Sequence, residues 1–263
     1  MRGLNVKRVR PFIIVLAVGF CAAAAFGQEA GANAKVISGG AEFDVNSRYL
    51  WRSLAFSQGA VWQPSAWIGA AGFTFSVWGN YVLHQEENYF QFNEIDYRIS
   101  YAREFGPLKI EPAFTAYSYL HQPDSPTTGE FELRLSYDLG PFSLATAHFF
   151  DVWRNPGGYI GEIGIEFERA PSADLTVNAS ARLMFANSKF NAYYVPLTKM
   201  ALNAFVLEIG CTLALTDAIS IRPHLEWNRI LDGALRAALA TSTVVSVGKA
   251  SQLNFGVAFG IEF

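Results

Sequence analysis

The last eleven residues of the chain, Leu253–Phe263, alternate between apolar side chains and small or polar ones. Because neighbouring side chains of a strand point to opposite faces, this period of two predicts a strand with one apolar face. Eleven residues at about 3.3 Å rise, tilted by about 40°, climb roughly 25 Å, which is the height of the apolar band of a membrane barrel. The last strand of a soluble sandwich would show the same alternation, so the rest of the chain has to decide.

The same alternation recurs along the chain, with turn residues between the runs, and predicts twelve strands. Most of them carry apolar side chains on one face and charged or polar side chains on the other. The pattern is weaker in the second strand, and the phase of the seventh is ambiguous. The predicted strands cover Ile37–Trp51, Val61–Ala70, Phe73–Leu83, Glu94–Tyr101, Leu108–Leu120, Glu130–Tyr137, Phe142–Asp151, Tyr159–Glu168, Leu175–Phe185, Phe205–Leu215, Ile219–Trp227 and Leu253–Phe263.

The connections between these strands alternate between short and long, and every short one falls at the end that holds the C-terminus. Outer-membrane barrels have this arrangement, with an even strand number, short periplasmic turns and long extracellular loops. The sequence therefore predicts an all-β fold, a transmembrane antiparallel β-barrel of about twelve strands. Aromatic residues near the strand ends are expected at the membrane interfaces; they are Tyr49, Trp51, Tyr81, Tyr101, Phe167 and Phe185.

The N-terminus has the features of a secretory signal peptide. A basic start is followed by the apolar run Phe12–Ala25, and Ala25-Phe26-Gly27 places small residues before a cut at Gln28. We expect residues 1–27 to be a signal peptide and residues 28–263 to be the barrel, in the outer membrane of a Gram-negative bacterium. Cys21 leaves with the leader, so the one remaining cysteine, Cys211, forms no intrachain disulfide.

Charge and motifs exclude several classes of function. Cleavage leaves 16 Lys+Arg against 23 Asp+Glu, a net charge near −7, and no basic patch suits a nucleic acid. No metal, cofactor or nucleophile motif occurs, so the sequence predicts no enzyme, no catalytic residues, no metal site and no cofactor. An outer-membrane hydrolase with His148, Asp151 and Ser143 is a distant alternative, because a triad depends on spatial geometry.

Three short stretches resemble the TorF-like porins, a family of exported bacterial proteins. They are Ser47–Arg52, where the family often continues with Gly and this chain has Ser53, then Gly72–Gly79 and Asn93–Tyr97. The resemblance implies an outer-membrane barrel and no particular substrate. The C-terminal strand also resembles the recognition strand of outer-membrane proteins. That likeness implies binding of the barrel-assembly machinery through Leu253–Phe263, with outer-membrane lipid and lipopolysaccharide as surroundings.

Charged residues on the polar face of the strands are expected to line the lumen, because each would cost several kcal/mol near the bilayer midplane. This predicts a passive channel for small cationic or polar solutes, with modest cation preference because acids outnumber bases. The alternatives are an ion-pair network that fills a structural or adhesive barrel, and the hydrolase. The expected lining residues are Glu42, Asp44, Arg48, Glu94, Asp96, Arg98, Glu111, Glu130, Glu132, Arg134, Glu162, Glu166, Arg182, Glu208, Arg222 and Glu226.

Two further segments allow more than one interpretation. Trp51-Arg52 can form a ligand site, but a tryptophan at a strand end is more often an interface anchor, with its arginine reaching toward headgroups. Leu231–Ala240, in the longest loop, has the composition of a helix. It either enters the lumen as a constriction or covers the outside.

Overall fold

The computed structural model describes residues 37–57, 59–84, 90–122, 125, 127–241 and 250–263. The expected signal peptide, its cleavage site before Gln28 and residues 242–249 of the longest loop lie outside these ranges.

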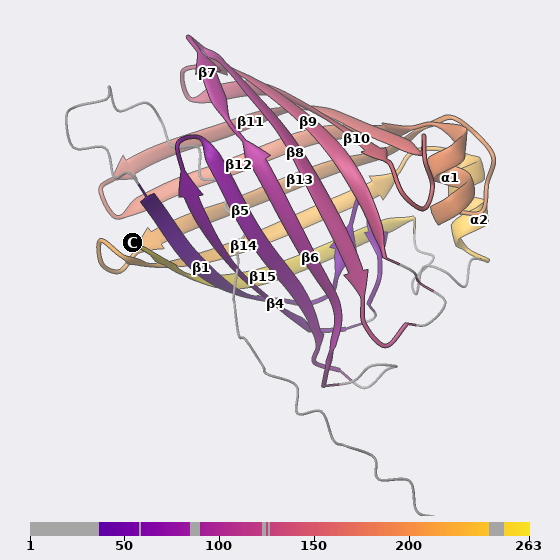
Figure 1. Cartoon of the computed structure of the whole chain (residues 1–263), viewed down its shortest axis with the longest axis horizontal. Coiled ribbons are helices and arrows are strands. Elements are labelled where there is room, and N and C mark those ends of the chain that lie inside the picture. Colours follow the sequence, from indigo (N-terminus) through magenta and orange to yellow (C-terminus); the bar gives the residue numbers. More distant parts are fainter. Residues whose placement is uncertain (1–36, 58, 85–89, 123–124, 126, 242–249) are drawn as a thin grey trace, which may run out of the picture.

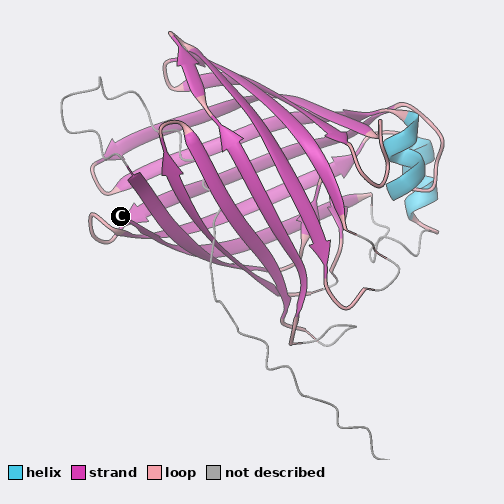
Figure 2. Cartoon of the chain, viewed as in Figure 1, coloured by secondary structure: helices cyan, strands magenta, loops and turns pink. Residues whose placement is uncertain are grey.

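Twelve strands form one closed antiparallel barrel, as the sequence predicts (Figures 1 and 2). Each strand pairs with the next along the chain, and β1 pairs with β15 to close the ring. The barrel strands are β1 (Ile37–Asn46), β4 (Val61–Ala70), β5 (Phe73–Val82), β6 (Phe92–Tyr101), β8 (Leu108–Tyr119), β9 (Thr128–Leu139), β10 (Phe142–Asp151), β11 (Tyr159–Ser172), β12 (Leu175–Ala186), β13 (Ala201–Ala214), β14 (Ile219–Ile230) and β15 (Ser251–Glu262).

Three short strands and two short helices complete the described structure. A hairpin of β2 (Leu50–Trp51) and β3 (Leu54–Ala55) follows β1, and β7 (Arg103–Phe105) extends the turn between β6 and β8. The helices are α1 (Ser188–Tyr194) and α2 (Gly233–Leu239). Among the described helices, neither has the length and apolar content needed to cross a membrane.

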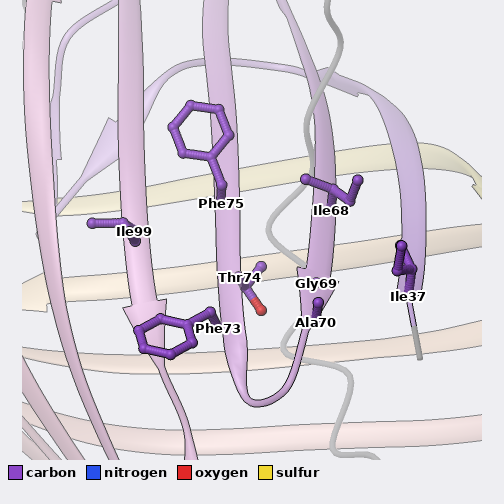
Figure 3. A pocket seen from close by; sticks show the side chains of 8 residues that line it. All are labelled: Ile37, Ile68, Gly69, Ala70, Phe73, Thr74, Phe75 and Ile99. Atoms are coloured by element: carbon purple, nitrogen blue, oxygen red, sulfur yellow. The ribbon is translucent and has the colours of Figure 1, made fainter. Parts of the chain in front are cut away.

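The outer wall of the barrel is apolar. Ile163, Ile209 and Phe255 project from it with 57%, 56% and 63% of their surface exposed. A shallow groove of about 240 Å³ lies on this wall. Figure 3 shows its lining side chains, among them Phe73 on β5 and Ile99 on β6. Apolar exposure on this scale is unfavourable in water and is expected where strands face hydrocarbon.

The apolar core lies at one end of the barrel rather than along its axis. The long connections and both helices are at this end, which we call the long-loop end, and the C-terminus lies at the opposite, short-turn end (Figure 2). Phe190 of α1 and Leu235 of α2 are buried there against β11, β12, β13 and β14. Lys199 forms an ion pair with Asp232, the N-cap of α2, and so lowers the pKa of that carboxyl below its usual range. Leu231–Ala240 therefore contributes to an end cap.

The first strand is shorter than predicted. It ends at Asn46 instead of Trp51, because Ser47 and Arg48 both hydrogen-bond the side chain of Asn254 on β15 and turn the chain inward. Arg52 then takes a left-handed conformation with φ of 50°, as required by the tight turn between β2 and β3. Two consecutive polar residues after Asn46 break the period of two and are the sequence signal for this end.

The structure assigns the phase of β10, which the sequence left ambiguous. Phe142, Leu144 and Phe150 face outward, and so do the polar Thr146 and His148 between them. The Tyr159 hydroxyl on β11 lies 2.8 Å from His148 Nδ1, and Thr146 Oγ1 lies 3.2 Å from the other ring nitrogen. Hydrogen bonding within this outer-wall group compensates for its polarity, which the period of two does not reveal.

Candidate functional site

Seven of the sixteen predicted lining residues form, together with Lys109, an alternating series of acids and bases along the inner wall, which we call the ion-pair belt. It begins at Lys109 and Glu111 on β8, 3.5 Å apart, and ends at Glu208 on β13. These contacts form because the polar side chains of neighbouring antiparallel strands lie on the same face of the sheet, within reach of one another. Its remaining contacts are Arg98–Glu111 (2.9 Å), Arg98–Glu132 (2.9 Å), Arg134–Glu132 (3.0 Å), Arg134–Glu162 (3.8 Å), Arg182–Glu162 (3.5 Å) and Arg182–Glu208 (3.0 Å).

Two further pairs join β14 to β1 across the C-terminal strand, and we call them the seam pairs. Arg222 lies 2.7 Å from Glu42, and His224 lies 3.1 Å from Asp44. These contacts bridge β15, which lies between their strands, because its inward positions carry only small residues here. At Gly256 a Cβ would lie 2.5 Å from His224 Nε2, so the small phase of the C-terminal strand is what allows the crossing.

Amide side chains continue the polar wall where charges are sparse. Asn46 on β1 donates to Gln63 at 3.0 Å, Gln63 donates to Asn80 at 2.9 Å, and Asn80 donates to Asn93 at 2.7 Å. Asn254 on β15 donates to Asn46 at 2.8 Å. The lumen is therefore also lined by neutral hydrogen-bonding groups, which lie beside charged residues such as Glu42 on β1 and Glu94 on β6. The lining residues predicted from the sequence were all charged and did not include these amides, although the amides occupy the same polar phase of their strands.

The β2–β3 hairpin folds into the lumen and is the main functional element that the sequence did not reveal. Arg52 at its tip donates two hydrogen bonds to Glu130 on β9, one of them 2.7 Å from Nη1 to Oε1. The Tyr117 hydroxyl on β8 donates to the same carboxylate at 2.8 Å. The guanidinium lies 4.3 Å from the ring centroids of Trp51 and Phe149. Both partners of this ion pair are buried, with side-chain exposures of 7% and 3%.

This placement corrects the interpretation of Trp51-Arg52 as a membrane-interface anchor. The Trp51 ring packs against Tyr194 of α1, with centroids 5.0 Å apart, and Tyr49 packs against Trp78 of β5 at 5.5 Å. Both rings point into the barrel and are not in an outer aromatic girdle. The physical reason is the inward turn after Asn46, which moves every later residue of the segment off the wall.

The hairpin spans the lumen at the long-loop end. Besides β8, β9 and β10, it contacts β12, where the Ser53 hydroxyl lies 3.5 Å from the Met184 sulfur. Leu54 is buried in the apolar cluster of the end cap. A segment held to several sides of the wall narrows the opening between them.

A polar cavity of about 210 Å³ remains between β1, β13, β14 and β15. Leu50 of the hairpin borders it, so it lies directly beside the constriction. Its lining residues are Asp44, Asn46, Arg48, Leu50, Gln63, Glu208, Arg222, His224, Glu226 and Asn254.

Four of the expected lining acids have no ion-pair partner among the described residues. Glu94 and Asp96 occupy the inner phase of β6, Glu166 accepts a hydrogen bond from Ser143 at 3.4 Å, and Glu226 accepts one from Asn228 at 3.3 Å. Among the described residues, Arg48 is the one base of the expected lining set without an ion pair. After pairing, acids without a partner therefore outnumber bases without a partner among the described residues of the inner wall. Arg52, which the sequence analysis had placed toward the lipid headgroups, adds one base but is paired with Glu130.

The distant hydrolase alternative finds no support in the geometry. His148 faces outward, whereas Ser143 and Asp151 are an odd number of residues away and face inward. Asp151 is buried and accepts hydrogen bonds from Thr128 and from the backbone amide of Asn155. Within the described ranges, no group of His, Cys, Asp and Glu has metal-site geometry.

A comparison with one solved structure supports the fold. A NanC porin matches with a TM-score of 0.54 and 13% sequence identity, over 85% of this chain and 98% of that one. A KdgM porin has a TM-score of 0.49 and 14% identity, over 86% and 99%. No protein-family model matches the sequence. No curated protein matches it. The chain thus has the fold of a porin-like β-barrel, and the resemblance to the TorF-like porins stays a prediction.

Proposed function

We propose that the protein is a passive channel for small polar solutes in the outer membrane of a Gram-negative bacterium. It would be made as a precursor, cleaved before Gln28, and assembled through Leu253–Phe263 by the barrel-assembly machinery into outer-membrane lipid and lipopolysaccharide. The observation that carries the proposal is the contrast between the two faces of the barrel. An apolar outer wall encloses an inner wall of charges and amides with an open polar cavity.

The hairpin sets the size limit of the proposed channel. It is fixed by Arg52–Glu130 at its tip and by Leu54 in the end cap, so it narrows the long-loop end without relying on a mobile loop. Solutes that pass must fit between the hairpin and the wall of β1, β14 and β15. This favours small solutes over oligomeric ones.

The test combines location and conductance. Mature protein that begins at Gln28 should be extracted by detergent from the outer-membrane fraction. In a planar bilayer it should give discrete KCl current steps, because the charged lumen stays hydrated. Recovery as a soluble periplasmic protein would contradict the location. Folded protein that inserts without any current steps would contradict the channel.

The proposed channel should prefer cations modestly. In the part of the chain that the structure describes, lining acids without an ion pair, such as Glu94 and Asp96, outnumber Arg48, the lining base without one. A negative lumen in a low-dielectric wall concentrates cations. Reversal potential under a KCl gradient measures this preference. High salt should weaken it, since the Debye length is about 10 Å at 0.1 M.

The double variant Glu94→Gln/Asp96→Asn should shift the reversal potential toward anions. Glu104→Gln, on the exposed β7, is the control and should leave it unchanged. A chloride preference in the unmodified protein would contradict the prediction and implicate Arg48 or Arg52. An unchanged potential in the double variant would show that these acids lie off the conducting path.

A non-transporting structural or adhesive barrel is the second candidate, and one observation favours it. The hairpin, the ion-pair belt and the seam pairs fill much of the inner wall with contacts between wall residues. In that function they would stiffen the barrel and no solute would pass. Absence of current from folded, inserted protein would support this candidate.

A further inference from the structure

The cavity beside the hairpin contains two opposite charges that do not neutralise each other. Arg48 comes from the start of the inward turn after β1, and Glu226 comes from β14. They lie on either side of Asn254, since Glu226 is opposite Asn254 across β14 and β15, and Asn254 Oδ1 accepts the backbone N–H of Arg48 at 3.2 Å. The two charged residues thus share one neighbour and one cavity.

Arg48 lacks an anionic partner among the described residues. Its Nη1 donates to the neutral amide oxygen of Gln252 at 2.7 Å, and its buried Nε has no hydrogen-bond partner there. A guanidinium carries five donors that match a carboxylate in a fork geometry. Leaving such donors unsatisfied away from bulk water is unfavourable, so the site is suited to an incoming carboxylate.

Glu226 lacks a cationic partner in the same sense. It is directly opposite Glu208 across β13 and β14, and two like charges in that position repel. Arg182 on β12 contacts Glu208 at 3.0 Å and Glu162 at 3.5 Å and forms no ion pair with Glu226 among the described residues. A positive group placed between Glu226 and Glu208 would relieve the repulsion, and both carboxylates line the cavity.

We propose that this cavity is a binding site for a small zwitterionic solute of amino-acid size, with its carboxylate on Arg48 and its ammonium group between Glu226 and Glu208. The cavity volume of about 210 Å³ is far more than a single water needs, which suits such a solute. The inference rests on the proposed channel function, because the solute reaches the cavity through the lumen. It adds the chemical class of that solute.

The test uses L-alanine as the zwitterion, with acetate and ethylammonium as probes that carry one charge each. Binding to the full-length mature protein in detergent is measured by saturation-transfer NMR, and channel block is measured as reduction of the KCl current. Alanine should bind saturably and reduce the current, and each single-charge probe should bind about tenfold more weakly, because it satisfies only one side.

Variants locate the site. Arg48→Gln and Glu226→Gln should each weaken alanine binding by about tenfold, whereas Arg48→Lys, which keeps the charge, should weaken it less. Arg103→Gln and Glu104→Gln make the same changes on the exposed β7 and should leave binding unchanged. If the control variants weakened alanine binding as much, the assignment of the site to Arg48 and Glu226 would be overturned. Arg48→Lys also keeps the proposal testable if Arg48→Gln does not fold.

The possible outcomes separate this proposal from the channel function. KCl current without alanine binding overturns the zwitterion site and leaves the channel intact. Alanine binding without current overturns the channel and keeps the site. Acetate or ethylammonium binding as tightly as alanine overturns the assignment of a solute that carries both charges.

Discussion

Replacing Arg52 with alanine is expected to raise the single-channel conductance several-fold, which is the largest functional change that the structure predicts. Arg52 holds the hairpin tip to Glu130 through two charge-assisted hydrogen bonds in a buried setting. Removing one partner of a buried ion pair typically costs about 3–5 kcal/mol, because the remaining charge is left without compensation. The hairpin has no other ion pair among the described residues to hold its tip, while Leu54 keeps its other strand in the end cap. The tip should therefore leave the wall and widen the passage.

Current steps in planar bilayers measure the effect, with Arg52→Lys and Arg154→Ala as comparisons. Arg52→Lys keeps the charge but loses the fork geometry, so its conductance should be intermediate. Arg154 lies exposed between β10 and β11 at the same end, so its replacement by alanine should leave the conductance unchanged. Unchanged conductance in correctly folded Arg52→Ala would show that the hairpin is not the constriction.

Replacing Gly256 with valine is expected to destabilise the barrel where it closes. A Cβ at this position would lie 2.4 Å from Asn46 Oδ1 and 2.5 Å from His224 Nε2, so the side chains that cross β15 must move. The bond from Asn254 to Asn46 and the pair of His224 with Asp44 would both be disturbed. Overpacking of a filled site costs about 1–3 kcal/mol, and loss of these polar contacts adds to it.

Urea unfolding and the temperature at which the folded electrophoretic band disappears measure this loss. Gly233→Val is the matched control, since a Cβ at Gly233 would meet only Arg236 Nη2, at 3.5 Å. The stability of this control should stay close to that of the unmodified protein in both measurements. Equal stability of Gly256→Val and the unmodified protein would show that the side chains from β14 and β1 do not meet over β15.

Strand number and facing were predictable because they depend on a local rule. Alternation places Ile163 and Ile165 on one side of β11 and Glu162 on the other, and the membrane penalises the reverse assignment strongly. The same rule left the phase of β10 undecided, because two polar residues lie on its outer face. Thr146 and His148 are polar and face outward, because hydrogen bonds within their own group replace those to water.

The candidate site was predictable in composition but not in pairing. The inward phase of Arg98 and Glu132 follows from the sequence, whereas their contact across 34 residues depends on which strands are neighbours. The seam contact of Arg222 with Glu42 joins residues 180 positions apart, through the ring closure of β15 with β1. Register between distant strands is a property of the closed ring, so no local pattern encodes it.

The amino-acid sequence alone predicts the barrel, its approximate strand number and its two faces, because period-two patterning and the expense of charge in lipid act residue by residue. The folded barrel is needed to show that the segment after Asn46 turns inward, that Arg52 contacts Glu130, and that Arg48 and Glu226 share a cavity without pairing with each other. Those features depend on side chains from distant strands meeting inside a closed ring. A single strand carries no information about the strand that will face it across the lumen.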